Sequence, residues 1–165
     1  MATIGALCRR LHLAADRLGE TRFPSLAAHA RDDGWLRALV GTREQDELHA
    51  LLTPGADDRL LHIDLHALNV LRAAHGWVAI DPKPCLGDPC AEIYGLLDGA
   101  PLTRLPDRGG RARRWLQTQL ARYGTASGHD PERLAAWLRI RAQILLAQGA
   151  GTKRESLLRL RDALG

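Results

Sequence analysis

The sequence contains few cysteines and no long apolar run. Its three cysteines, Cys8, Cys85 and Cys90, show no CxxC spacing, which argues against a disulfide framework and against a four-cysteine zinc site. We therefore expect free, buried thiols in the reducing environment of the cytoplasm. No apolar run approaches the roughly 20 residues that cross a bilayer. The basic pair Arg9-Arg10 follows the N-terminal apolar stretch, whereas a secretory signal places its charge first, so neither a membrane partner nor secretion is expected.

Aromatic residues are also scarce, at 4% of the chain, and most of the apolar content is leucine and alanine. This mixture favours helices over strands. The 165 residues, 45% of them apolar and 25% charged, are typical of one soluble domain that builds its core without disulfides. The composition therefore excludes wholesale disorder and predicts a mainly helical protein.

Positive charge comes almost wholly from arginine, because Lys83 and Lys153 are the only two lysines. Residues 1–100 carry 10 basic and 14 acidic side chains, whereas residues 101–165 carry 13 and 5. A basic half can bind nucleic acid, but these arginines follow helical repeats with little aromatic interleaving. We therefore expect a solvated helical face, and nucleic-acid binding is only a minor alternative.

Hydrophobic periodicity and capping residues predict helices on both sides of a short segment rich in strands. The expected helices are residues 3–18, a stretch from Pro24-Ser25 that Gly34 weakens, 42–52 with a Thr42–Gln45 capping box, the stretch after Pro89 through Leu97, 109–123 ended by Gly124, 131–148 capped by Asp130, and 153–164 opened by a Thr152–Glu155 capping box. The expected strands are 59–63, 69–72 and 77–80, with a hairpin turn at His75-Gly76. The predicted fold class is α+β, mainly helical, with a small β-hairpin.

Polar residues concentrate in the loop between the first two expected strands. A carboxylate, Asp64, and a carboxamide, Asn69, stand five residues apart there, and Asp81 follows the apolar run of the third strand. Strand ends and the loops beyond them present side chains to ligands from a rigid scaffold. Asn69 and Asp81 offer the oxygen ligands that Mg²⁺ prefers, and Asp64 is available to take the proton of an acceptor hydroxyl. The pattern therefore favours phosphoryl transfer.

A structural interpretation of the same residues stays open. Asp64 and Asn69 also suit turns, and Asp81 also suits the cap of a strand end. The strands on both sides, the spacing to Asp81 and the Gly87-Asp88-Pro89 sequence beyond it favour the functional interpretation over coincidence.

The residues around this pattern resemble a known family. The stretch LHIDLHALNVL at 61–71, followed by GWVAIDPKP at 76–84 and GDP at 87–89, looks like the catalytic core of the aminoglycoside phosphotransferases. The Asp-Pro-Lys-Pro variant points to the streptomycin 6-kinase and hydroxyurea kinase branch of that family. The motifs cover about residues 59–97. This resemblance implies the C-terminal lobe of a protein-kinase-like fold, with ATP and Mg²⁺ as cofactors.

The resemblance also implies a role for each matching residue. Asp64 resembles the catalytic base that orients the acceptor hydroxyl, and Asn69 and Asp81 resemble the Mg²⁺ ligands. The residues expected in a second layer around the catalytic loop are His62, His66 and Asp88. Lys83, just beyond Asp81, is a candidate contact for a phosphate or for the acceptor, with a solvated loop lysine as the plain alternative.

The sequence departs from the family pattern in two places. Ile63 stands where the family usually has glycine. If the family uses that glycine for its backbone freedom, a β-branched residue is expected to alter the loop. The 58 residues before the catalytic segment predict helices and contain no lysine and no glycine-rich strand-turn-strand. We therefore expect one domain that lacks an N-terminal nucleotide-covering lobe: residues 1–58 follow the interlobe hinge, 59–97 form the catalytic and metal-binding segment, and 98–165 form a helical subdomain.

Two hypotheses about function follow. In the first, the chain is an ATP-dependent phosphotransferase that moves a γ-phosphate to an alcohol group of a small molecule, an aminoglycoside such as streptomycin, in antibiotic resistance. In the second, it is a truncated, non-catalytic remnant that binds a small molecule or a protein, because a missing lobe removes positioning and electrostatic stabilisation. The face toward that lobe should be partly apolar, so the expected partner is a separate N-terminal lobe or a second copy.

Overall fold

The computed structural model describes residues 1–15, 23–97, 105–106 and 110–165. The end of the predicted helix 3–18 and the first residue of the predicted helix 109–123 lie outside these ranges. Within them, no helix combines the length and the apolar character that crossing a membrane requires.

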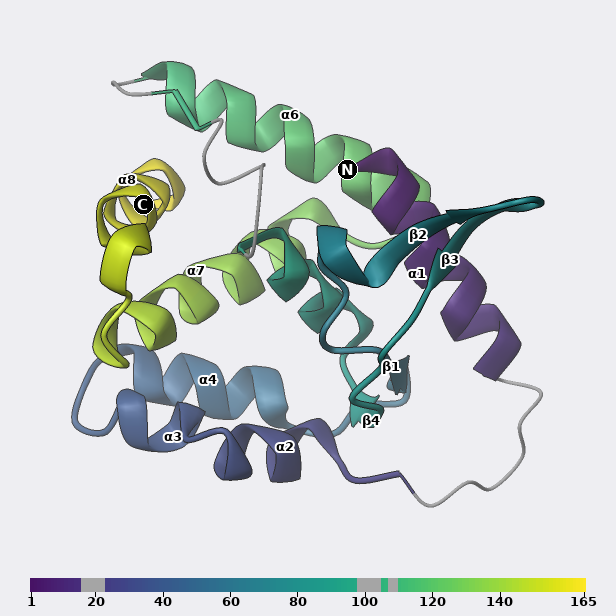
Figure 1. Cartoon of the computed structure of the whole chain (residues 1–165). Helices are drawn as coiled ribbons and strands as arrows, with labels where there is room; N and C mark the ends of the chain where they lie inside the picture. The colour runs from purple at the N-terminus through teal and green to yellow at the C-terminus, as the bar shows by residue number, and fades with distance from the viewer. Residues whose placement is uncertain (16–22, 98–104, 107–109) are drawn as a thin grey trace.

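Helices surround a small group of strands and 3₁₀ segments (Figure 1). In chain order the helices are α1 (Ala2–Ala15), α2 (Leu26–Asp32), α3 (Trp35–Ala38), α4 (Glu44–Leu52), α6 (Gly110–Ser127), α7 (Pro131–Ala147) and α8 (Arg154–Leu164). The strands are β1 (Arg59–Leu61), β2 (Val70–Ala73), β3 (Gly76–Ala79) and β4 (Cys85–Gly87). The 3₁₀ segments are η1 (Ala67–Asn69), η2 (Pro89–Leu97) and η3 (Gly151–Lys153). The mainly helical α+β class expected from composition is therefore confirmed.

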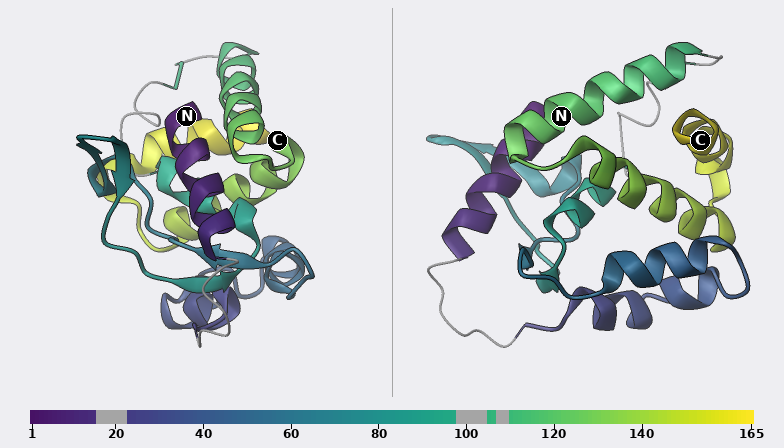
Figure 2. Two further views of the ribbon diagram at one scale, coloured as in Figure 1. Left: turned by 90° about the vertical axis from the view of Figure 1, so that its right-hand side faces the viewer. Right: turned by 180° about the vertical axis from the view of Figure 1, so that it is seen from behind.

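Helix α7 forms the centre of the core. It contacts α4, α6, α8 and η2, and α1 lies along α6 on one side of the molecule (Figures 1 and 2). Helix α7 starts where the sequence predicted. The Asp130 side chain accepts from the N–H groups of Glu132 and Arg133, and Pro131 occupies the first turn. Trp137 and Leu138 are fully buried one turn later. The helix therefore fixes the position of whatever packs on it, η2 included.

Two antiparallel two-stranded sheets lie beside the helices. In the first, β2 pairs with β3 in the predicted hairpin, with Leu71 opposite Val78, and this hairpin projects from the helical body (Figures 1 and 2). Its turn is Ala74-His75 rather than the predicted His75-Gly76, because Gly76 already pairs with Ala73. In the second, β1 pairs with β4. The sequence did not predict β4, because a strand of three residues is too short to show an alternation of apolar and polar side chains. The expected strand 59–63 ends at Leu61, because the N–H groups of His62 and Ile63 donate to the Glu92 carboxylate instead of to a neighbouring strand.

Several predicted helix boundaries are wrong. Helix α4 begins at Glu44 without a side-chain cap, and the Gln45 carboxamide accepts from Gly41 N–H, one residue before the expected partner. Gly124 does not end α6, which runs to Ser127 and turns at Gly128, where φ is 84°. The capping box at Thr152 does not form, because a 3₁₀ turn precedes α8 and its N-cap makes no side-chain hydrogen bond. The stretch after Pro89 is 3₁₀ rather than α-helical.

The three cysteines, Cys8, Cys85 and Cys90, are free and buried, as predicted. Burial raises the pKa of the Cys85 thiol to about 12 and raises the pKa values of the other two further. They are packing residues rather than nucleophiles.

Candidate active site

Asp64, Asn69 and Asp81 flank the two strands of the β2–β3 hairpin, at the end away from its turn. Asp64 and Asn69 belong to the loop that joins β1 to β2, and Asp81 follows β3 by one residue. The Ile80 N–H donates to the Asn69 carbonyl at 3.0 Å, which extends the hairpin ladder by one step. The structure therefore brings the predicted base and both predicted metal ligands to the same end of one hairpin.

Asn69 closes the loop on itself. Its side-chain Nδ2 donates to the Asp64 carbonyl at 2.9 Å, and its backbone N–H donates to the His66 carbonyl at 2.9 Å. The side chain is buried. Because the nitrogen is used by the loop, the amide oxygen is the atom that remains for a ligand.

The Asp64 carboxylate has two neighbours with positive or partly positive groups. Lys83 Nζ lies 2.9 Å from Oδ2, and His66 Nε2 lies 3.7 Å from Oδ1. His66 Nδ1 accepts from the Leu68 N–H at 3.2 Å, so the neutral ring carries its proton on Nε2, the nitrogen that faces Asp64. The Lys83 ammonium thus pairs with the predicted base, and the Lys83 side chain is 62% exposed.

His62 connects this loop to the segment that carries Asp81. Its Nε2 bonds the Ile80 carbonyl at 2.9 Å, and its own carbonyl accepts from the Lys83 N–H at 3.0 Å. Burial lowers the pKa of His62, against the opposing effects of the Ile80 hydrogen bond and of the Asp64 and Asp81 carboxylates. The ring is therefore a neutral donor that holds the two segments together.

Ile63 adopts a positive φ of 55° although it is β-branched. A β-branched residue was expected to alter the loop if a positive φ is needed at this position, and Ile63 nevertheless adopts a positive φ. Two contacts hold it: its side chain is buried, and its N–H donates to Glu92 Oε2 at 3.1 Å. Glu92 Oε1 accepts from the neighbouring His62 N–H in a short hydrogen bond. One buried carboxylate therefore fixes two consecutive peptide groups directly before Asp64.

Glu92 and Gly95 were not among the predicted site residues. Burial raises the pKa of Glu92 to about 7, against the effect of its two backbone hydrogen bonds. A Cβ built on Gly95 would lie 1.8 Å from the Leu65 carbonyl oxygen, so η2 approaches the loop backbone more closely than a side chain allows. The only signal in the sequence was the spacing of Glu92, four residues after Asp88.

Asp88 holds η2 on α7 and makes no contact with the loop among those resolved for the described residues. Its Oδ1 accepts from the Cys90 N–H at 2.9 Å. Its Oδ2 accepts from Arg133 Nε at 2.7 Å and from Trp137 Nε1 at 2.6 Å. Asp88 therefore reaches the loop only through η2, whose Glu92 makes the direct bonds.

Asn69 and Asp81 have the chemistry of a Mg²⁺ site that is completed by a substrate. Asp81 is exposed, and within the described ranges no hydrogen bond or ion pair engages its carboxylate. No three His, Cys, Asp or Glu side chains in those ranges gather closely enough to hold a metal ion alone. Because Mg²⁺ commonly takes one or two protein oxygens plus phosphate oxygens and waters, two free oxygen ligands fit that ion.

Known proteins with similar sequences include two kinases and a phosphotransferase. Streptomycin 6-kinase of Streptomyces griseus is 36% identical over 95 residues, which are 57% of this chain and 26% of that protein. Hydroxyurea phosphotransferase of Kitasatospora aureofaciens is 44% identical over 77 residues, 45% of this chain and 21% of that protein. Streptomycin 3''-kinase of Klebsiella pneumoniae is 38% identical over 86 residues, 47% of this chain and 30% of that protein.

These matches span a minor part of each relative, between 21% and 30% of its length. No solved structure matches the chain significantly. Residues 5–149 match the family model described as aminoglycoside/hydroxyurea antibiotic resistance kinase. That match covers most of the chain, including every residue of the candidate site, and the chain therefore belongs to this family.

Proposed function

We propose that the chain carries the phosphoryl-transfer part of an ATP-dependent small-molecule kinase, with an alcohol group of an antibiotic such as streptomycin as acceptor. The observation that carries this proposal is the presentation of Asp64, Asn69 and Asp81 at one end of the β2–β3 hairpin. The names of the similar proteins, two streptomycin kinases and a hydroxyurea phosphotransferase, support the reaction class and the acceptor class.

In this proposal Asp64 receives the proton of the acceptor hydroxyl. A base must stand within hydrogen-bond reach of the hydroxyl and must be held in a fixed orientation. The Asp64 backbone is fixed from both sides, by Asn69 Nδ2 on its carbonyl and by Glu92 on the two preceding N–H groups. Lys83 and His66 orient the carboxylate itself. In this proposal Lys83 positions the base, and contact of its ammonium with a phosphate or with the acceptor stays a prediction.

Asn69 Oδ1 and the Asp81 carboxylate would hold Mg²⁺, which when bound supplies positive charge to the transferring phosphate. The chain's part is to keep these two oxygens in place. Asn69 is locked by its bonds to Asp64 and His66. Asp81 is held by the backbone on either side, through the His62–Ile80 bond and the Lys83 N–H. We also propose that the described helices and the hairpin form a kinase-like C-terminal lobe.

The test is transfer of a labelled γ-phosphate from ATP to streptomycin in the presence of Mg²⁺. The chain is assayed alone and with a separately expressed N-terminal segment of the Streptomyces griseus relative. Asp64→Asn should lower the rate at least about 100-fold, the lower range for loss of a general base, and Asp81→Asn should also lower it strongly because it removes a charged ligand of Mg²⁺. Asp32→Asn, an exposed carboxylate on α2, is the matched control and should leave the rate unchanged.

Equal rates in the wild type and both site variants would contradict the assigned roles. Absence of transfer under both conditions, combined with retained nucleotide binding, would favour the non-catalytic binding module instead.

A further inference from the structure

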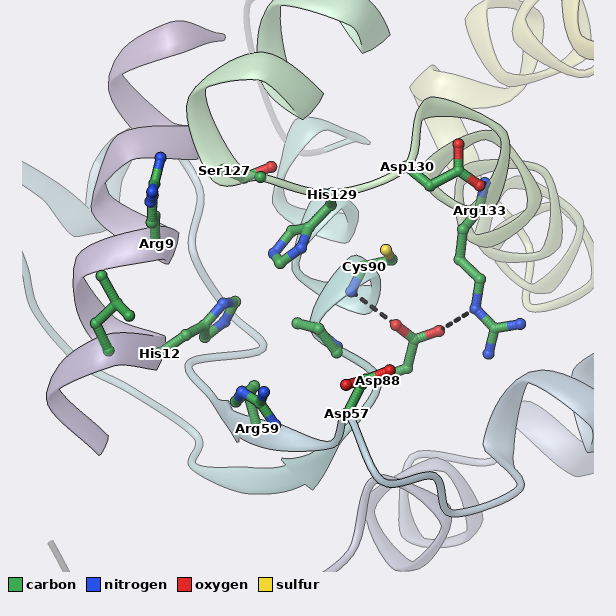
Figure 3. A pocket seen from close by; sticks show the side chains of 13 residues that line it. Arg9, His12, Asp57, Arg59, Asp88, Cys90, Ser127, His129, Asp130 and Arg133 are labelled. Carbon is green, nitrogen blue, oxygen red and sulfur yellow. Dashed lines mark hydrogen bonds and ion pairs between the residues drawn. The ribbon is translucent and has the colours of Figure 1, made fainter. Parts of the chain in front are cut away.

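A pocket of about 510 Å³ is lined by residues other than those of the hairpin site. Figure 3 shows it between α1, the start of β1, the start of η2 and the α6–α7 turn. We call it the α1–α7 pocket and define it by Arg9, His12, Arg59, Asp88, His129 and Arg133. Its lining includes none of Asp64, Asn69, Asp81 and Lys83. Its volume lies within the range of small-molecule sites.

Two histidine rings in this pocket carry buried nitrogens that lack a hydrogen-bond partner in the described part of the chain. Both ring nitrogens of His12 and the Nε2 of His129 are buried without a partner, and His12 is only 5% exposed. The ring centroids stand 5.4 Å apart, and Figure 3 shows both rings turned into the same space. A buried polar group without a hydrogen-bond partner destabilises the folded state. A ligand or ordered water that supplies oxygens would therefore remove a real cost.

Arginines stand on both sides of His12. Arg9 lies on the same face of α1, three residues before it, and Figure 3 shows Arg59 on the other side. Burial is the main cause that lowers the pKa of His12 to about 4, and Arg59 adds to it. Burial also lowers the pKa of His129; the Asp88 carboxylate opposes this effect, and Arg59 adds to it. The positive charge of Arg59 therefore reaches both rings.

The carboxylates of the pocket are mostly engaged already. Asp88 accepts from Arg133 and Trp137. Asp130 accepts from the first N–H groups of α7. Asp57 also lines the pocket and is its remaining acid. The half of the pocket around His12 thus combines two cations and two imidazoles with unused nitrogens.

We propose that the α1–α7 pocket binds the phosphate group of a small molecule through His12, His129, Arg9 and Arg59. A phosphate offers several terminal oxygens, which suit donors that converge from different elements. The pocket is larger than one phosphate group, so the remainder, lined by Leu13, Pro89 and Cys90 among others, takes the body of the ligand. His12 Nε2 lies 4.0 Å from Glu92 Oε1, so the bound group would stand one side chain away from the carboxylate that holds the catalytic loop.

Inorganic phosphate is the probe, added without divalent cation to the isotope-labelled full chain while imidazole signals are followed by NMR. The His12 and His129 signals should shift saturably, and the exposed His75 of the hairpin turn should not. His12→Gln and Arg59→Gln should each weaken binding by about tenfold or more, the value of one hydrogen bond to a charged group. Circular dichroism checks that both variants fold.

Asp81→Asn separates this site from the hairpin site and should bind phosphate as the wild type does. Acetate in place of phosphate tests the charge class and should bind more weakly. A pocket that holds only water would show no saturable shift of His12 or His129, and that result would overturn the proposal. Equal phosphate affinity in the wild type and in Arg59→Gln would overturn it as well.

Discussion

At the scale of single residues, Ile63 stores backbone strain next to the candidate base. An L-residue at a positive φ costs roughly 1–2 kcal/mol, and a β-branched side chain makes the conformation rarer still. The φ of Ile63 is 55°. Its buried side chain and its hydrogen bond to Glu92 hold it there. The loop therefore depends on packing and on one carboxylate to keep Asp64 in place.

Replacement of Ile63 by alanine and by glycine separates strain from packing. Both variants lose the buried side chain, which costs about 2–5 kcal/mol. Glycine also releases the strain, so Ile63→Gly should be about 1 kcal/mol more stable than Ile63→Ala. At an ordinary position, glycine is the less stable of the two by about 0.5–1 kcal/mol. Urea denaturation measures the unfolding free energies of the two variants. A glycine variant that is less stable than the alanine variant would contradict a positive φ at this residue.

Glu92 gives the protein a pH dependence of known sign. Burial raises the pKa of its folded state from 4.5 to about 7. Its contribution to stability is therefore full below pH 4.5 and is lost as the pH rises through about 7. The pKa of His12 is lowered from 6.5 to about 4, so its contribution has the opposite sign and is lost as the pH falls through about 4.

The variant Glu92→Gln isolates the first contribution. The excess of wild-type over variant unfolding free energy should be largest near pH 5 and should shrink towards pH 7.5, by up to about 3 kcal/mol. Urea denaturation of both proteins across this range measures it. A difference that does not change with pH would show that Glu92 is ionised throughout.

At the scale of elements, η2 holds the loop of the candidate site against the core helix α7. Asp88 at its start bonds α7, Glu92 in its middle bonds the loop N–H groups, and Gly95 packs on the Leu65 carbonyl. These contacts form a chain from the core helix to the candidate base. The geometry of the loop thus depends on an element that carries no proposed catalytic residue.

Gly95→Ala should disrupt the contact between η2 and the loop. Its methyl group would meet the Leu65 backbone, which cannot yield without moving the loop, so we expect a loss of about 3 kcal/mol. Gly110→Ala is the control, because there the nearest atom is the end of the flexible Arg114 side chain. Thermal denaturation compares the two variants. Equal melting temperatures would mean that η2 does not approach the loop as closely as described.

The sequence predicted elements well where a long period or a strong cap defines them. Helix α7 and its Asp130 cap and the β2–β3 hairpin follow the predictions. The predictions failed where tertiary contacts determine the local structure. Gly124 lies within α6, where a Cβ would approach the His129 carbonyl to 2.7 Å, and no local pattern reveals such a contact. The bonds of Glu92 to residues about 30 positions away are invisible for the same reason.

At the scale of the whole molecule, the hairpin presents an apolar surface. Its exposed apolar residues, together with the one before it in the loop, are between 40% and 81% exposed: Leu68, Leu71, Trp77, Val78 and Ile80. Leu71 and Val78 share one face of the hairpin and Trp77 lies on the other, and exposed apolar surface favours association. Both strands of the hairpin also have an unpaired edge within the described residues, which adds hydrogen-bonding groups to that surface. The expected binding to a separate lobe or a second copy stays a prediction.

Sedimentation velocity over a range of concentrations tests self-association. The wild type should show a concentration-dependent increase in average mass. The double variant Leu71→Glu and Val78→Lys places opposite charges directly across the hairpin, which keeps the strand pair but removes the apolar surface. It should sediment as a monomer, whereas Val40→Lys, at an exposed residue after α3, should behave as the wild type. A wild type that stays monomeric at high concentration would contradict the prediction.

The most direct test of the phosphoryl-transfer site is the position of a paramagnetic cation bound with nucleotide. Mn²⁺ added with ATP should broaden the backbone NMR signals of Asn69 and Asp81 in the wild type and leave those of α8 sharp. In Asp81→Asn the broadening at Asn69 should disappear. Broadening that is absent from the hairpin end, or that is the same in Asp81→Asn, would contradict the assignment of Asn69 and Asp81 as the oxygen ligands of a kinase site.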